Sequence, residues 1–216
     1  MGAIARNIAN KITTSGVFTS GAITNSSVTG ITVLANASDG ITFISSQTAS
    51  NSASLSFTSG LTSTYKAYKF VYVNLDPVST ADYTGIEFNL STDGGSNYNV
   101  TKTTTFFRAF HFEADTNTSL SFQSGAAQST SYQGIAERIG ANSDDSVSGS
   151  LILFNPSSTT YVKHFLSSTS EVNNSPAAMN NVVAGYGNTT SAVNAISFRA
   201  TTGNLNSGTI YMYGIK

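Results

Sequence analysis

The residue types best suited to chemistry gather at His111, Glu113 and Asp115. These three alternate along the chain, so on a β-strand their side chains would all point to one face. Imidazole and carboxylate groups on one face are typical ligands for a divalent cation. The alternative is that the strand ends here and runs into a loop at Thr116–Asn117, where the polar groups face water. Spacing alone is weak evidence for a metal site, so we predict no bound metal and no other cofactor.

The sharpest local motif is Ser91-Thr92-Asp93-Gly94-Gly95-Ser96-Asn97-Tyr98, which matches the Asp-box pattern S-x-D-x-G-x-x-aromatic. In such a turn the Asp carboxylate caps backbone N–H groups, the glycines take positive φ, and the aromatic ring folds back. Sialidases carry several Asp boxes, as structural turns and not as catalytic residues. The motif therefore predicts a structural hairpin built on Ser91, Asp93, Gly95 and Tyr98.

Nothing else in the chain matches a catalytic pattern. No nucleophile elbow, P-loop, dinucleotide fingerprint or H-E-x-x-H motif is present. Cysteine is absent, which excludes disulfides, thiol catalysis and thiolate metal sites. A glycoside hydrolase needs two carboxylates across a cleft, and the 11 acidic residues are scattered without selecting such a pair. We predict that the protein is not an enzyme.

The composition indicates a folded β protein with a polar surface. Charged residues make up 10% of the chain, against a typical share of about 25%, and Ser and Thr are abundant. The 10 Tyr and 13 Phe supply enough buriable area to argue against disorder. A net charge of −1 gives no electrostatic basis for binding nucleic acid. No apolar run approaches the roughly 20 residues of a membrane span, so we predict no membrane insertion.

Residues 41–216 contain short β-rich segments separated by turn clusters. About ten strands in this length fit a two-sheet jelly roll. We therefore predict an all-β fold, a jelly-roll-like β-sandwich. Residues 68–75 alternate Phe70 and Tyr72 with Val71 and Val73, so both faces are apolar and a central strand is predicted.

Residues 1–13 form a separate zone with helical periodicity. Ile4, Ile8 and Ile12 recur every four residues, with Arg6 and Lys11 between them. One interpretation is a frayed terminus, because terminal residues are usually loose. The other is an anchor peptide whose isoleucine stripe enters a groove on another protein.

Residues 14–40 carry a five-residue repeat, SGVFT-SGAIT-NSSVT-GITVL, with Phe18, Ile23, Val28 and Val33 at its fourth position. One chain cannot bury this stripe, so it predicts a shaft formed with other copies, most simply a homotrimer. The alternative is a flexible Ser/Gly-rich linker.

Four phrases of the remaining chain carry a family resemblance: SLSFTSGLTSTYKAYKFVYVNLDP, STDGGSNYN, FNPSSTTYVKHF and SGTIYMYGIK. They resemble small fibre or head-decoration proteins of tailed bacteriophages that infect marine bacteria, over roughly residues 44–216. The resemblance implies a protein on the outer surface of the phage particle, held to capsid or tail proteins by its N-terminus and displaying a β domain. Its expected work is capsid decoration or adhesion to host surface glycans. It supplies no catalytic residues and leaves head or tail location open.

Two other functions stay open at this stage. A secreted carbohydrate-binding module would carry a signal peptide, and the start MGAIARNIANKIT is too polar for one. A glycan depolymerase of a tail spike would show a paired-carboxylate cleft in the folded protein.

Overall fold

The computed structural model describes residues 40–77, 84–123, 125–173 and 175–216. Within these ranges the chain is all-β, as its composition and periodicity predicted, and it contains no helix that could cross a membrane. The strands are β1 (Ile41–Thr48), β2 (Leu55–Phe57), β3 (Ala67–Pro77), β4 (Thr84–Ser91), β5 (Lys102–Phe112), β6 (Thr118–Gln123), β7 (Gln133–Ile139), β8 (Val147–Phe154), β9 (Lys163–Asn173), β10 (Ala177–Gly187), β11 (Ala195–Ala200) and β12 (Leu205–Ile215).

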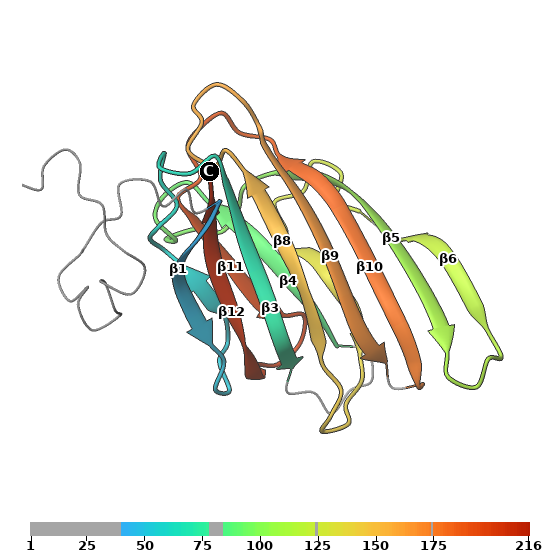
Figure 1. Ribbon diagram of the computed structural model, residues 1–216. Helices are drawn as coiled ribbons and strands as arrows, with labels where there is room; N and C mark the ends of the chain where they lie inside the picture. The colour runs from blue at the N-terminus through green and yellow to red at the C-terminus, as the bar shows by residue number, and fades with distance from the viewer. Residues whose placement is uncertain (1–39, 78–83, 124, 174) are drawn as a thin grey trace, which may run out of the picture. The chain divides into compact units, whose positions relative to one another are not determined.

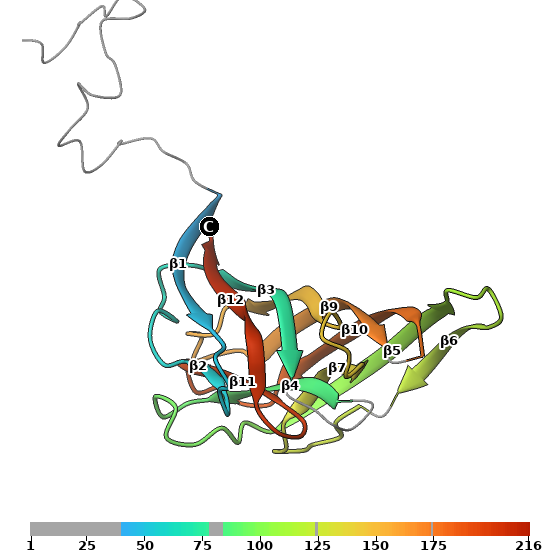
Figure 2. The ribbon, with the colours of Figure 1, turned by 90° about the horizontal axis from the view of Figure 1, so that it is seen from below.

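Eight of these strands form a jelly roll. They pair as β1-β12-β3-β8 in one layer and β2-β11-β4-β7 in the other, and every pairing is antiparallel. If β5, β6, β9 and β10 are left out and the remaining eight strands are renumbered 1 to 8 along the chain, the two layers have the strand orders 1-8-3-6 and 2-7-4-5. These are the orders of the two interlocked Greek keys of a jelly roll. Figure 2 shows the two layers from the side. The predicted jelly-roll-like sandwich is therefore confirmed.

The other four strands enlarge one layer. The hairpin β9–β10 is inserted between β8 and β11, and the hairpin β5–β6 between β4 and β7. Because β9 pairs with β8 and β10 pairs with β5, the larger sheet runs β1-β12-β3-β8-β9-β10-β5-β6 (Figure 1). We call β9, β10, β5 and β6 the extension. A pairing of Ile139 with Asn173 joins β7 to β9.

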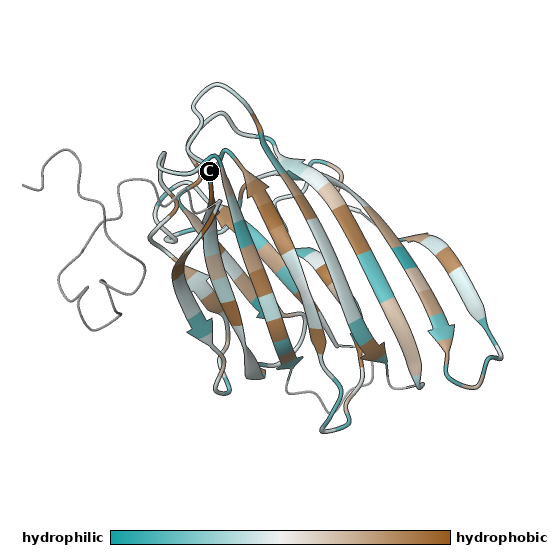
Figure 3. Ribbon diagram, viewed as in Figure 1, coloured by the Kyte–Doolittle hydropathy of each residue, from teal (hydrophilic) through white to brown (hydrophobic). Residues whose placement is uncertain are grey.

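Aromatic rings fill the space between the two layers of the jelly roll. Phe198 of β11 lies at the centre, with ring centroids 5.5 Å from both Phe70 and Tyr72 of β3. Phe57 and Phe88 complete the cluster at 6.4 and 6.3 Å from Phe198. Each ring is at most 3% exposed. The strands alternate apolar and polar residues, visible as colour bands in Figure 3, so every second side chain enters this core.

Three details differ from the sequence-based prediction. Residues 99–107 and 109–114 were expected to be separate strands, yet a single β5 continues through Arg108 because that side chain is buried beneath the sheet. Strand β7 was not predicted, since Glu137 and Arg138 interrupt its apolar pattern. Strand β3 is central, as expected, but the described residues cover only one of its faces, and Val73 on the other face is 42% exposed.

Candidate functional site

The three residues proposed as metal ligands do not share a strand face. Strand β5 ends at Phe112, and Glu113 and Asp115 lie in the following turn, where Asp115 has a positive φ of 54°. His111 Nε2 and Asp115 Oδ1 are 2.9 Å apart and both side chains are exposed. The loop alternative is thus the right one. Over the described ranges no group of three or more His, Asp or Glu side chains is placed to hold a metal.

The Asp box forms the predicted turn. Asp93 Oδ1 accepts hydrogen bonds from the Asn97 N–H (2.9 Å) and the Ser91 hydroxyl (2.7 Å), while the Gly95 N–H donates to Ser91 Oγ (3.0 Å). Gly94 and Gly95 have φ of 73° and 91°. The bonds from Asn97, followed by that from Ser91, lower the pKa of Asp93 to about 2.

The ring of Tyr98 closes over this turn. Its hydroxyl would lie 2.7 Å from a Cβ added at Gly95, so only glycine fits there. One correction is needed: the flanking strands β4 and β5 are not ladder partners, so the motif is a capped turn between strands and not a β-hairpin. Its role is structural.

A polar cluster that the sequence did not reveal lies beneath the extension. The inward residues of β5, β9 and β10 there are largely polar, although they are buried. They include Lys102, Thr104, Arg108, Lys163, Ser167, Thr169, Glu171, Asn173 and Asn181. The one sequence feature that could have revealed the cluster was the alternation in KHFLSSTSEVN (residues 163–173). Its odd-numbered residues are the buried ones in the structure. Serine, threonine and glutamate at those positions are typical of a solvated strand face. The pattern therefore did not indicate that these residues are buried.

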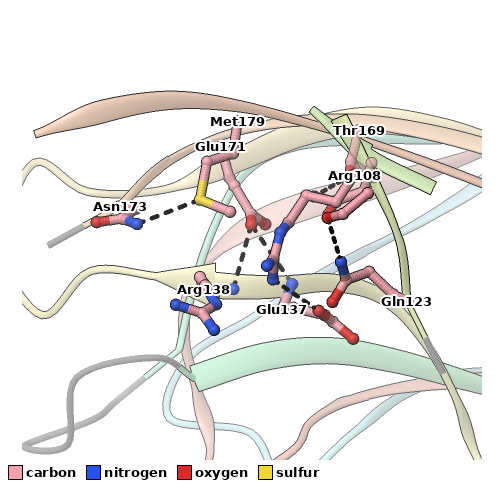
Figure 4. Close-up of polar contacts among 10 residues, drawn as sticks. Arg108, Gln123, Glu137, Arg138, Thr169, Glu171, Asn173 and Met179 are labelled. Carbon is pink, nitrogen blue, oxygen red and sulfur yellow. Dashed lines mark hydrogen bonds and ion pairs between the residues drawn. The ribbon is translucent and has the colours of Figure 1, made fainter. Parts of the chain in front are cut away.

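An ion pair connects this cluster to β7. Arg108 Nη1 lies 3.0 Å from Glu137 Oε2, with side-chain exposures of 10% and 32% (Figure 4). Burial raises the pKa of Glu137, and the charge of Arg108 partly opposes that rise. Burial likewise lowers the pKa of Arg108. Desolvation is the largest cause of both pKa shifts, so the pair fixes the position of β5 against β7 without adding much stability.

Glu171 of β9 makes a second link to β7. Its Oε1 accepts hydrogen bonds from the backbone N–H groups of Arg138 (3.1 Å) and Glu137 (3.4 Å). Glu171 is 2% exposed, and this burial raises the pKa of its carboxyl group. Glu171 Oε2, Asn181 Oδ1 and Arg108 Nε have no hydrogen-bond partner among the protein atoms of the described residues. Such unpaired buried groups are unfavourable, so the cluster holds the sheets together less tightly than the aromatic core does.

A cleft of about 490 Å³ opens beside β7 on the outer side of the smaller sheet, with Glu87, Glu137, Arg138 and Thr201 among its lining residues. Glu87 Oε1 accepts a hydrogen bond from Arg199 Nε at 2.6 Å. The guanidinium of Arg199 also stacks 3.8 Å from the ring centroid of Tyr132. Two carboxylates therefore line one cleft, and each is paired with an arginine.

A second depression, of about 330 Å³, lies over the extension. Its lining includes Thr103 and Thr105 of β5, His164 of β9 and Tyr186 of β10. The rings of His164 and Tyr186 meet edge to face with centroids 6.2 Å apart. Aromatic rings beside hydroxyl groups offer both stacking and hydrogen bonding to a polar ligand.

Comparisons with protein-family models, with curated proteins and with solved structures found no match. The proposed anchor residues (Ile4, Arg6, Ile8, Lys11, Ile12) and shaft residues (Phe18, Ile23, Val28, Val33) lie outside the described residues. Their roles stay predictions, and the described geometry bears on function only through the jelly roll and its surfaces.

Proposed function

We propose that this chain is a structural protein of a bacteriophage virion, either a head fibre or decoration protein or a short tail fibre. Residues 1–13 attach it to capsid or tail proteins, residues 14–40 associate as a homotrimer, and the jelly roll is displayed on the outer surface of the particle. The protein performs no catalysis in this role.

The observation that carries the proposal is where the four phrases of the resemblance fall in the fold. Two of them form the neighbouring strands β3 and β12 of the larger sheet, which pair in register at Phe70 and Met212. A third phrase is the capped turn at Asp93, and the fourth leads from β8 into β9. The likeness to phage fibre and decoration proteins therefore covers the framework of the jelly roll and not one peripheral loop. Because one fold serves many functions, this likeness supports a proposal and needs a test.

Adhesion to host glycans is the second part of the proposal. The depression over the extension offers the Tyr186 and His164 rings with the hydroxyls of Thr103 and Thr105. Sugars stack on aromatic rings and bond to hydroxyls, so this is the described surface best suited to a weak glycan contact. Several copies on one particle would raise the avidity of a weak site.

Deleting residues 1–13 tests the anchor. We expect the truncated chain to keep the melting temperature of the β domain, because the described core is built from side chains between Ala49 and Met212. Phage assembled with the truncated gene should lack the protein, as measured by quantitative mass spectrometry of purified particles. A matched control, replacing Arg6 and Lys11 with Ala while keeping Ile4, Ile8 and Ile12, should retain partial occupancy. Full occupancy of the truncated protein would show that the contact lies on the jelly roll.

A depolymerase is the second candidate, because Glu87 and Glu137 line one cleft. Glycosidases use such a pair, one carboxyl protonated and one ionised, and the pKa of Glu137 is raised by burial. The arginine paired with each carboxylate favours the structural role. Purified protein incubated with host capsular polysaccharide should release no reducing ends. Release that disappears in both Glu87→Gln and Glu137→Gln would establish the enzyme instead.

A further inference from the structure

The apolar side chains left exposed on this protein are concentrated on one face. Ten large hydrophobic residues of the described chain are exposed. Apart from Tyr161, which lies in the loop between β8 and β9, all of them lie in strands of the larger sheet and point away from the core. Contiguous exposed apolar surface of this kind marks an interaction site.

The densest part of this face lies where the chain enters and leaves the sheet. Register places Ile41, Ile215 and Phe154 in one row, with Ala67 between the last two. The next row contains Phe43, Tyr213 and Leu166, with Lys69 and Ile152 between them. We call these six residues (Ile41, Phe43, Phe154, Leu166, Tyr213 and Ile215) the end patch. Lys69 is the only charged residue in the two rows.

The sequence of the neighbouring strand also indicates a covered surface. Val71 and Val73 of β3 continue the apolar face beyond the end patch, and Tyr72 faces the core between them. A strand with one wet face alternates apolar and polar residues, whereas a strand apolar on both faces is typically covered on both. The described residues cover β3 on one face only, so the second cover would come from another molecule or from a segment outside them.

The point where the N-terminal segment joins the sheet indicates which molecule covers the end patch. Residues 1–39 lead through Gly40 into Ile41, the first residue of the end patch. Copies held together by the apolar stripe of residues 14–40 would therefore carry their end patches next to the point where they are tethered. Tethering converts a weak contact into an effectively intramolecular one.

The area of the end patch also favours contact with a tethered copy of the chain. An aromatic side chain buries about 150–250 Å² when fully covered. Phe43 is 55% exposed, and the other large residues are comparable or less so, so the patch offers on the order of 400–600 Å² of apolar surface. A stable interface between free partners buries about 800 Å² on each. The end patch is therefore too small to form a stable interface with a free partner, but it is large enough to bind a copy that is already tethered. We infer that the end patch is the contact between copies of this chain.

This inference rests on the proposed association of residues 14–40 but not on a virion location, and the oligomeric state of the full chain tests it. In sedimentation equilibrium, the double substitution Phe43→Asp/Leu166→Asp should weaken association by about tenfold or more, because it places charge in an apolar contact. The matched control is Leu120→Asp/Phe122→Asp on β6, at the opposite edge of the same sheet, where the side chains are 74% and 62% exposed. This control should change association less than about twofold. Both variants should melt close to the wild type, because the substituted side chains are 45–74% exposed.

Crosslinking provides a second measurement. The chain has no cysteine, so Lys69→Cys introduces a single thiol in the middle of the end patch. A short bismaleimide should link this variant into covalent dimers, and the control Thr105→Cys on the extension should stay uncrosslinked.

Three results would each overturn the inference. They are a wild-type chain that is monomeric at about 100 μM, an oligomer unaffected by the end-patch substitutions, or dissociation caused by the β6 control instead. Equal crosslinking of the two cysteine variants would also place the contact elsewhere.

Discussion

The two halves of the larger sheet cover interiors of opposite character. Beneath β12 and β3, Phe70 packs against Phe198 of the opposite layer at 5.5 Å, and no charged group intervenes in that ring cluster. Beneath β10 and β5, the inward side chains include Arg108, Glu171 and Asn181, each with one unpaired polar atom. Both interiors are largely buried, but the second mixes these polar groups with apolar side chains such as Phe106, Phe165 and Val183.

The difference follows from how each half is built. The jelly roll has two layers of four strands, and rings from both layers interlock. The extension has no second layer of its own, and it packs chiefly against the edge strand β7, which brings Glu137 and Arg138 with it. We conclude that apolar burial stabilises the jelly roll, whereas directed polar contacts position the extension on it.

Removing the central ring should give the largest effect. Phe198→Ala leaves a cavity among Phe57, Phe70, Tyr72 and Phe88, and such truncations cost about 3–5 kcal/mol. Urea denaturation should show that loss in the free energy of unfolding. Phe122→Ala on β6 is the control, and it should cost about 0.5 kcal/mol or less because the ring is exposed. Similar costs for the two would contradict an aromatic core at this position.

Breaking the ion pair should give a smaller effect, confined to the extension. Arg108→Met leaves Glu137 and Glu171 as neighbouring acids without their cation, at a cost of about 2–3 kcal/mol. The double variant Arg108→Met/Glu137→Leu removes both charges and should recover most of that loss. Hydrogen exchange should show faster opening of β5 and β10 in the single variant, with β3 and β12 unchanged. If β3 and β12 open equally, the two halves form one cooperative unit and the comparison fails.

The smallest effect concerns protonation of Glu171. Burial raises its pKa above the ordinary value of 4.5, so above pH 4.5 the folded state binds more protons than the unfolded state does. The free energy of unfolding therefore falls as pH rises from 4.5 to the pKa of Glu171 in the folded protein. Above that pKa, Glu171 contributes no further pH dependence. Glu137 contributes in the same direction. The lowered pKa of Asp93 acts oppositely, with stability lost as pH falls from 3.8 to about 2.

Glu171→Gln should flatten the decline above pH 4.5 and make the protein more stable than the wild type at neutral pH, because the amide carries no charge to bury. Thermal unfolding followed from about pH 2 to pH 8 measures this difference. Asp93→Asn is the control, because it should change the acid side of the profile alone. An unchanged slope above pH 4.5 in Glu171→Gln would mean that Glu171 is ionised in the folded protein.

Much of the jelly roll could be predicted from local pattern. The apolar residues at 68–75 located β3, because a strand with apolar side chains on both faces lies inside a sheet. The Asp-box residues specified their turn mainly by contacts within eight consecutive residues. Asn194, which is distant in the chain, adds a hydrogen bond accepted from the Gly94 N–H at 2.8 Å. The cleft at Glu87 and the link from Glu171 to β7 were not predictable, because their partners lie tens of residues away.

By itself, the sequence determined the class of fold, the turn at Asp93 and the apolar outer side of β3, each of which depends on residues close together in the chain. Only the tertiary structure decided that β9 and β10 extend the sheet beyond the jelly roll. It also decided that Arg108 and Glu171 are buried and not solvated. The physical reason is that a polar residue on a strand can face either water or a polar partner, and alternation alone does not distinguish the two. Pairing of β5 with β10 and packing against β7 supply that partner.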